Sequence, residues 1–301
     1  MVKKKRWGKK YKDKRDWKLY NKQLVKRGEF YINLSFLETW LTEIKDMNYS
    51  KIGQPYLYPA SLIEFLAVLY AKAFDYRALE GIVHGLSQRL GNFPVISFSQ
   101  IRRRIKGFKT AFQPKSSNLV VAVDGTGIKV SNRGEWIRQK WKVRRGWIKV
   151  VIMGDTNGNI VDVRIGNEDL NENSSGRGML RKNHKNVNKF LGDGLYDTKD
   201  NFRLCSQLGV EPVIKIREDA STRARGCLAR KKEVLEYRKL GYKQWAKDKG
   251  YGMRWPASEG IFSASKRIFG EYVRSHKKRD MYHEARLKFW AYQQVKDYGM
   301  K

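Results

Sequence analysis

From position 118 to position 130 the chain reads NLVVAVDGTGIKV, and this stretch decides the fold. Residues 119–123 form an unbroken run of small and β-branched apolar side chains, which suits a strand buried on both faces of a sheet better than an amphipathic helix. Asp124 comes next and is followed by Gly-Thr-Gly. A carboxylate inside an apolar strand is costly to bury unless a cation, a metal or a hydrogen-bond network pairs with it. The alternative is that Asp124 accepts hydrogen bonds from the backbone of the glycine turn.

A second aspartate has the same sequence context further along the chain. Residues 187–191 predict a short strand that leads into Gly192-Asp193-Gly194. We expect the two strands to be neighbours in one sheet, with Asp124 and Asp193 close together at their ends.

The order of the elements after Pro114 predicts an α/β fold class. Strands are expected at residues 119–130, 147–153, 160–165, 187–191 and 210–216. Asp155 and Asn157 are expected to form the hairpin turn between the second and third strands. Residues 167–183, rich in Asn, Ser and Gly, predict a loop with room for one helical turn. With helices at 197–208 and from Ser258 onward, this is the order of a ribonuclease-H-like domain, a mixed sheet flanked by helices.

The composition points to a polyanionic partner. The chain has 301 residues with 63 Lys and Arg against 30 Asp and Glu, a formal net charge of +33, and 41% hydrophobic residues can supply a sizeable core. Nucleic acid is the first candidate partner and an acidic membrane surface the second. The longest apolar stretch, residues 62–74, is too short to span a bilayer, and no secretory signal is visible. Two cysteines with no metal-ligand spacing fit a reducing, intracellular setting.

The N-terminal third predicts an all-α DNA-binding region. In residues 1–33 we expect a basic arm that orders on a phosphate backbone, the alternative being a solvated tail. Residues 34–114 predict several helices, and the last of them carries Arg102, Arg103 and Arg104. This arrangement resembles a helix-turn-helix module whose last helix faces DNA, and a plain helical cap is the alternative.

Two further basic segments interrupt the sheet pattern. Before the second strand, basic residues alternate with Trp136 and Trp141; they are Arg138, Lys140, Lys142, Arg144 and Arg145. That pattern predicts a groove that follows a nucleic-acid backbone, unless the tryptophans pack on the edge of the sheet. Residues 218–253 are basic and poor in aliphatic side chains, which predicts a small insertion before the helix that begins at Ser258.

A third acid completes a set with metal-binding chemistry. A helix that packs across the sheet would bring Glu259 to the two aspartates, and three carboxylates offer the hard oxygen ligands that can hold two Mg²⁺ ions roughly 4 Å apart. Glu271 is the rival for the third position. It lies twelve residues beyond Glu259, about 120° around a helix, so only one of them can face the aspartates.

These motifs resemble a known family. VAVDGTGI, FLGDGLYD and RWPASEGIFSASKRIFGE are similar to the DDE transposases of prokaryotic insertion sequences, specifically the insertion sequence five group. The resemblance continues upstream through YPASLIEFLAVLYAKAFDYRALEGIV and FPVISFSQIRRRI, and therefore covers nearly the whole chain. It implies a catalytic domain formed by residues 118–217 and 254–301.

The resemblance also implies an activity and its residues. Asp124, Asp193 and Glu259 would be the catalytic triad that binds two Mg²⁺ or Mn²⁺ ions. Tyr251, Arg254 and Lys266 match the family's signature around the third acid, except that four residues instead of three separate Arg254 from Glu259. The three would contact DNA, although a plain surface lysine is the alternative for Lys266.

The implied enzyme binds the terminal inverted repeats of a mobile element, cleaves the strands and transfers them to target DNA. Its partner would be double-stranded DNA, bound by a homodimer or higher oligomer, with no membrane involved. Its location would be the cytoplasm of a prokaryote, at the nucleoid. Two other functions remain open: a metal-dependent nuclease of ribonuclease-H-like fold, and a catalytically inactive DNA-binding descendant.

Overall fold

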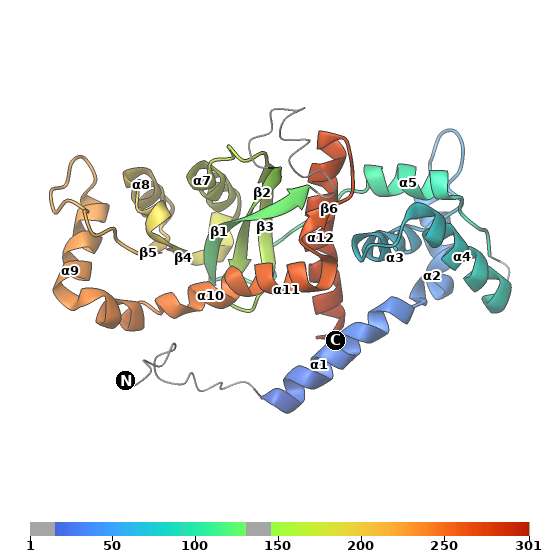
Figure 1. Cartoon of the computed structure of the whole chain (residues 1–301), viewed down its shortest axis with the longest axis horizontal. Coiled ribbons are helices and arrows are strands. Elements are labelled where there is room, and N and C mark those ends of the chain that lie inside the picture. Colours follow the sequence, from blue (N-terminus) through green and yellow to red (C-terminus); the bar gives the residue numbers. More distant parts are fainter. Residues whose placement is uncertain (1–15, 92, 131–145, 301) are drawn as a thin grey trace, which may run out of the picture.

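The computed structural model describes residues 16–91, 93–130 and 146–300. Figure 1 shows a central sheet with helices on both of its faces and a helical N-terminal region at one end of the molecule. Within the described part of the chain, no helix is both long enough and apolar enough to cross a membrane.

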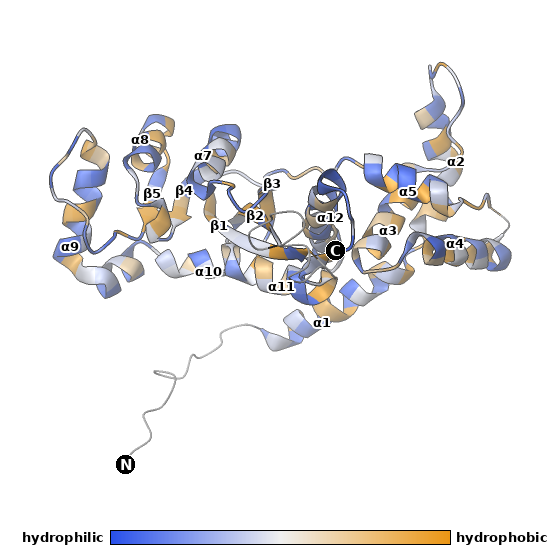
Figure 2. Ribbon diagram, turned by 45° about the horizontal axis from the view of Figure 1, so that its top comes forward, coloured by the Kyte–Doolittle hydropathy of each residue, from blue (hydrophilic) through white to orange (hydrophobic). Residues whose placement is uncertain are grey.

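The N-terminal region consists of helices, as the apolar spacing predicts. They are α1 (Trp17–Glu29), the short η1 (Phe30–Ile32), α2 (Ser35–Asn48), α3 (Ala60–Ala71), α4 (Tyr76–Leu90) and α5 (Phe98–Gly107). Helix α3 is apolar on almost every side (Figure 2), and nine of its residues are buried. A helix that is hydrophobic all round needs partners on all sides, and α3 finds them in α4, α5 and the C-terminal helix α12 (Lys278–Tyr298).

Part of the segment assigned to a basic arm is therefore helical. Asp16 caps α1 by accepting a hydrogen bond from the backbone nitrogen of Leu19 at 3.0 Å. The end of the helix reaches α12, where the rings of Phe30 and Tyr298 lie edge to face with centroids 5.5 Å apart. The ring contact places the C-terminal end of α1 against the C-terminal helix.

The sheet confirms the predicted fold class. Its order is β3-β2-β1-β4-β5, and β6 pairs with β1 beyond β4. The strands are β1 (Leu119–Val130), β2 (Trp147–Asp155), β3 (Ile160–Gly166), β4 (Val187–Gly192), β5 (Glu211–Ile214) and β6 (Tyr272–Val273). The first three are antiparallel and the last three join in parallel, which is the predicted mixed sheet.

The partners of β1 change along its length. On one side β2 pairs with nearly the whole strand, while on the other side β4 pairs only with residues 119–122 and β6 only with residues 129 and 130. Among the described residues, no strand covers residues 123–128 on that second side. The sheet therefore opens beside Asp124.

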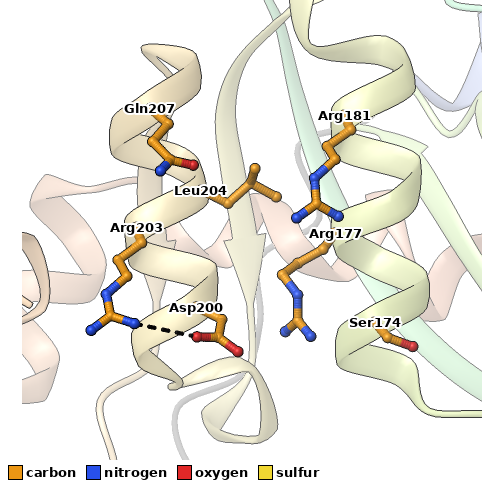
Figure 3. Close-up of a pocket in the computed structure, with 7 residues that line it drawn as sticks. All are labelled: Ser174, Arg177, Arg181, Asp200, Arg203, Leu204 and Gln207. Atoms are coloured by element: carbon orange, nitrogen blue, oxygen red, sulfur yellow. Dashed lines mark ion pairs between the residues drawn. The ribbon is translucent and has the colours of Figure 1, made fainter.

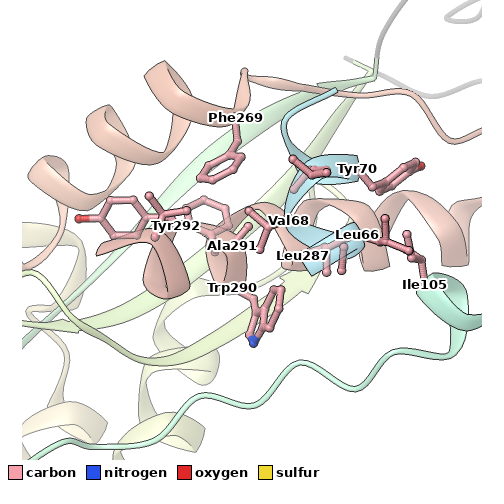
Figure 4. Packing of buried hydrophobic residues seen from close by; sticks show 14 of the residues in the cluster. Leu66, Val68, Tyr70, Ile105, Phe269, Leu287, Trp290, Ala291 and Tyr292 are labelled. Atoms are coloured by element: carbon pink, nitrogen blue, oxygen red, sulfur yellow. The ribbon is translucent and has the colours of Figure 1, made fainter. Parts of the chain in front are cut away.

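Helices cover both faces of this sheet. Helices α7 (Glu172–Asn183) and α8 (Lys199–Leu208) pack on one face, and α10 (Arg254–Ala257), α11 (Glu259–Phe269) and α12 pack on the other. The second face is continuous with the helical region, because Phe269 and Ala291 share one hydrophobic cluster with Leu66 and Ile105 (Figure 4). The N-terminal helices thus join, through α12, the face of the sheet that α10 and α11 cover.

The structure corrects the prediction of a loop at residues 167–183. Residues 172–183 form helix α7, which Asn171 caps by accepting a hydrogen bond from the backbone nitrogen of Ser174 at 2.9 Å. Gly176 explains the composition: a Cβ there would lie 3.3 Å from Val123 and 3.4 Å from Tyr196. Small residues let the helix approach the sheet closely, so a composition that is unfavourable for an isolated helix is favourable in this packing.

The predicted insertion carries helix α9 (Leu228–Asp248), followed by the short η4 (Tyr251–Met253). Helix α9 is kinked at Gly241, which has a left-handed φ of 71°. Trp245 is fully buried against Ala122, Leu191 and Tyr251. The segment is basic at its surface, but it also contributes to the core beneath the ends of β1 and β4.

Candidate active site

The two aspartates lie on adjacent strands. Ala122 of β1 pairs with Leu191 of β4, and Asp124 and Asp193 are each two residues further on. Because parallel neighbours lie about 5 Å apart and side chains alternate between faces, the two carboxyl groups stand side by side at the opening of the sheet. Asp193 also accepts a hydrogen bond from the backbone nitrogen of Leu195 at 2.8 Å, which holds it at the start of η3 (Gly194–Tyr196).

Burial dominates the electrostatics of Asp124. Desolvation raises the pKa of its carboxyl group above the ordinary value, and the nearby charges of Asp193 and Glu172 act in the same direction. A hydrogen bond from the backbone nitrogen of Gly125 at 2.8 Å and the positive charge of Arg254 oppose this shift. Both sequence-based interpretations of Asp124 therefore apply, because its carboxylate accepts a hydrogen bond from the glycine turn and also pairs with the cation of Arg254.

Arg254 links the third acid to the first. Its guanidinium donates from Nη1 to Oδ2 of Asp124 at 3.1 Å and from Nη2 to Oε1 of Glu259 at 2.6 Å. Arg254 opens α10, and Glu259 is the first residue of α11. The arginine thus lies between two carboxylates that come from segments more than a hundred residues apart.

The approach of α10 depends on a glycine in the sheet. Gly154 of β2 pairs with Ala122 of β1, and a Cβ at Gly154 would lie 2.1 Å from the backbone oxygen of Ala257. Only a residue without a side chain allows α10 to lie so close to the strands. This contact sets the depth at which Arg254 and Glu259 reach the two aspartates.

Lys266 lies on the same side of the sheet as Asp124. Its Nζ donates to Oγ1 of Thr126 at 2.8 Å, and Thr126 is two residues beyond Asp124 on β1. Burial lowers the pKa of the lysine, an effect that the charge of Glu271 opposes. Lys266 lies two helical turns beyond Glu259 on the same face of α11, so its ammonium group lies along the open edge of β1.

Tyr251 stands behind the arginine and not at the surface. It is buried, and burial raises the pKa of its hydroxyl to about 12. The guanidinium carbon of Arg254 lies 5.9 Å from the centre of its ring. The tyrosine is thus placed to support Arg254, and the DNA contact that the resemblance implies for it stays a prediction.

The rival acid lies elsewhere. Glu271 forms an exposed ion pair with Lys129, near the far end of β1 where β6 begins. Lys129 lies five positions beyond Asp124 on β1, about 17 Å along an extended strand. Glu259, and not Glu271, is therefore the glutamate beside the aspartates.

Sequence reasoning missed a fourth acid, Glu172. Its carboxylate fills the space where a side chain of Gly125 would be, since a Cβ there would lie 2.5 Å from its Cδ. Lys149 pairs with it at 3.2 Å, and the hydroxyl of Tyr196 lies 3.5 Å from its Oε2. Asn171 followed by Glu172 is typical of a helix start and could have indicated this acid, but we predicted a loop over these residues.

The residue types suit a divalent metal, although their arrangement here is not a finished site. Carboxylate oxygens are the ligands that Mg²⁺ prefers, and Arg254 already marks the space between Asp124 and Glu259 as one that holds positive charge. Among residues 16–91, 93–130 and 146–300, no three acidic, His or Cys side chains are placed to hold one ion. Glu259 is 46% exposed at its side chain, so a rotation about its own bonds can release it from the arginine.

The predicted DNA contacts of the N-terminal region divide into two groups. Arg102 and Arg103 are exposed on α5. Arg104 instead turns inward, with its guanidinium carbon 5.3 Å from the centre of the Tyr58 ring.

Five further basic residues were predicted to contact DNA from the segment between the first two strands. All five lie outside the described residues: Arg138, Lys140, Lys142, Arg144 and Arg145.

Comparison with known proteins gives one clear similarity. A family model described as a transposase DDE domain matches residues 115–293, and a second model with the same description matches residues 25–133.

Two solved structures are also similar. The piggyBac transposase synaptic complex with hairpin DNA has a TM-score of 0.39 and 9% identity, over 92% of this chain and 75% of that chain. The Drosophila P element transposase strand transfer complex has a TM-score of 0.29 and 14% identity, over 59% of this chain and 43% of that chain. Because both scores lie below 0.5, neither of these structures supports a conclusion about this chain.

Proposed function

Because the chain belongs to the DDE transposase family, we propose that it cleaves DNA at the terminal inverted repeats of a mobile element and joins the freed 3′-hydroxyl ends to target DNA. Members of the family are polynucleotidyl transferases that use divalent metal ions. For this chain the proposal names Asp124, Asp193 and Glu259 as the catalytic carboxylates, and it assigns the chain to the insertion sequence five group.

One observation carries this assignment. Asp124 and Asp193 follow paired positions of adjacent parallel strands, and Glu259 is joined to Asp124 through a shared arginine. No other acids among the described residues combine strand ends, partial burial and an open edge of the sheet in this way. Acids with this arrangement are suited to phosphoryl transfer, because they can hold metal ions against a phosphate.

The three carboxylates would hold two Mg²⁺ or Mn²⁺ ions. When bound, the ions supply a nucleophile of lowered pKa and stabilisation of the leaving oxygen. Asp124 and Asp193, fixed by backbone hydrogen bonds, give the site its rigid part, and Glu259 gives the part that can rotate. Since Arg254 pairs with two carboxylates when no metal is bound, its positive charge reduces the repulsion that would otherwise favour a protonated acid.

The surrounding residues would position the DNA. Lys266, on the open edge of β1, is placed to donate to a phosphate oxygen next to the reacting one. Arg102 and Arg103 of α5 would contact the double helix as the exposed face of a helix-turn-helix-like domain formed by residues 34–114. The basic segments 1–33, 131–145 and 218–253 would extend the phosphate contacts, and a homodimer or higher oligomer would hold the two ends of the element together.

The assay for this proposal uses purified protein, Mg²⁺ or Mn²⁺, and labelled DNA that carries the end of the element. We expect nicking at the end followed by joining to a second duplex. Asp193→Asn should abolish both steps and leave DNA binding intact. Asp219→Asn, which removes the same charge from an exposed position in the insertion, is the matched control and should behave as wild type.

The other outcomes identify the alternatives. Cleavage without preference for the element's end would make the protein a general nuclease of this fold. DNA binding with no cleavage under either metal would make it an inactive DNA-binding descendant. Residual cleavage by the Asp193→Asn protein would remove Asp193 from the catalytic set.

A further inference from the structure

A second basic site lies between helices α7 and α8, on the face of the sheet away from α10 and α11. The two helices border a pocket of about 370 Å³. Arg177 and Arg181 extend into it from α7, while Arg203 lines it from α8 with its guanidinium turned away from α7 (Figure 3). The spacing of four residues places Arg177 and Arg181 one helical turn apart on the side of α7 that faces α8.

The pocket carries an excess of positive charge. Three arginines line it with one acid, Asp200. Asp200 is 63% exposed at its side chain and its Oδ1 lies 3.7 Å from Nη1 of Arg203, so this pair contributes little neutralisation. Arg203 is held in place by hydrogen bonds from Nε and Nη2 to the backbone oxygen of Gly226 at 3.3 and 2.8 Å.

The two arginines of α7 differ in how they are held. Arg177 donates from Nη1 to Oδ1 of Asn201 at 3.3 Å. Asn201 is buried and itself donates to the backbone oxygen of Tyr196 at 2.7 Å. Arg181 is exposed, and within the described residues its side chain forms no ion pair or hydrogen bond. An oriented guanidinium beside an unpaired one is an arrangement that accepts a phosphate, because each can donate two parallel hydrogen bonds to its oxygens.

The pocket is connected to the candidate active site through α7. Glu172, whose carboxylate packs against Gly125, begins this helix. At 1.5 Å per residue, Arg177 and Arg181 follow it by about 8 and 14 Å along the helix axis. On one DNA strand, phosphates advance about 3.4 Å along the axis for each nucleotide. A strand that leaves the active site along α7 therefore reaches the pocket within a few nucleotides.

The pocket and the N-terminal helices lie on opposite faces of the sheet. Those helices join the opposite face of the sheet, through α3 and α12, while α7 and α8 belong to the cluster on the other face. One DNA segment bound by α5 would have to pass the open edge of β1 before it reached α7.

We propose that the pocket of Arg177, Arg181 and Arg203 binds the phosphate backbone of DNA on the side of the active site away from the N-terminal helices. This inference rests on the proposed function, since it takes the DNA to cross the site of Asp124 and Asp193. The pocket would hold the strand that continues past the cleavage point, and so keep the reacting phosphate from sliding out of the opening.

The first test is the salt dependence of binding to a short duplex of random sequence. Each phosphate contact that is lost lowers the slope of log affinity against log salt by about 1. We expect Arg181→Gln to lower the slope by about 1 and Arg177→Gln with Arg181→Gln by about 2. Lys185→Gln, an exposed lysine just beyond the end of α7, removes the same charge outside the pocket and should leave the slope unchanged.

The second test keeps all the arginines and locates the DNA directly. Cys205 and Cys227 are both buried, so Ser174→Cys places a single exposed thiol at the mouth of the pocket. With duplex DNA that carries a thiol-reactive tether on one phosphate at a time, we expect crosslinks at phosphates beyond the cleavage point. Lys185→Cys is the control, and it should crosslink weakly at every position.

The results separate this inference from the function on which it rests. If the wild-type protein cleaves and joins DNA while the double arginine variant keeps the full salt slope, or Ser174→Cys crosslinks no better than Lys185→Cys, the pocket proposal is wrong and the transposase proposal stands. If crosslinks form at the pocket but no metal supports cleavage, the pocket binds DNA and the catalytic proposal is the one that fails. Binding of inorganic phosphate with an unchanged DNA slope would also overturn the pocket proposal.

Discussion

The contact between Gly154 and α10 offers the sharpest test of the site's geometry. A Cβ at Gly154 would lie 2.1 Å from the backbone oxygen of Ala257 and 2.4 Å from Cδ1 of Ile261. Ordinary van der Waals contact begins at 3.4 Å, so Gly154→Ala requires α10 to move away from the sheet by about 1 Å. The obstacle is a backbone atom, which cannot rotate aside as a side chain can.

This displacement would carry Arg254 and Glu259 with it. A shift of about 1 Å in a catalytic group can reduce the rate about 100-fold, and overpacking of this kind costs about 1–3 kcal/mol of stability. We therefore expect Gly154→Ala to remain folded, to bind DNA with wild-type affinity and to cleave about 100-fold more slowly.

The assay is single-turnover cleavage of element-end DNA in saturating Mg²⁺, with thermal unfolding measured in parallel. Gly178→Ala is the matched control. A Cβ at Gly178 meets nothing within 4 Å, and alanine is favoured over glycine inside a helix, so this variant should cleave normally and unfold no earlier than wild type. Wild-type cleavage by the folded Gly154→Ala protein would refute the view that the close approach of α10 places the third acid.

Two other perturbations test separate parts of the site, and a third tests a buried lysine of α12. Arg254→Gln removes the cation that competes for two of the carboxylates, so we expect calorimetry without DNA to show roughly tenfold tighter Mn²⁺ binding; weaker binding would contradict the bridging role. Gly125→Ala should displace the carboxylate of Glu172, and it should therefore lower Mn²⁺ affinity by the same factor as Glu172→Gln, roughly tenfold; different factors would show that Glu172 does not act through this contact. Burial lowers the pKa of Lys288 to about 8, against the charge of Glu284, which raises it, while Arg274 lowers it further. Since the unfolded chain binds the proton more tightly, the free energy of unfolding should rise between pH 8 and about 10.5, by on the order of 3 kcal/mol, and Lys288→Met should lack this rise. Parallel pH profiles of the two proteins would show that Lys288 is charged when folded.

Much of the sheet could be predicted because its strands depend on local patterns. The apolar run before Asp124, the hairpin turn and the glycines around Asp193 specify strand positions that the structure reproduces within a residue or two. Asp155 forms the turn as expected, and accepts hydrogen bonds from the backbone nitrogens of Asn157 and Asn159 at 2.9 and 2.8 Å. Helix α7 could not be predicted in this way, because Gly176 is favourable only when a sheet lies against it.

In the candidate site, too, local sequence patterns specify some features and tertiary packing specifies the others. The sequence by itself determined which acids are available, that Asp124 and Asp193 end buried strands, and that Glu259 and Lys266 share a helix face, because period and polarity are properties of neighbouring residues. Only the tertiary structure decided that Arg254 stands between two of the acids, that Glu172 reaches the site through the missing side chain of Gly125, and that α7 and α8 form a basic pocket. These features join segments far apart in the chain, and their distances depend on how closely helices pack on the sheet, which no local pattern specifies.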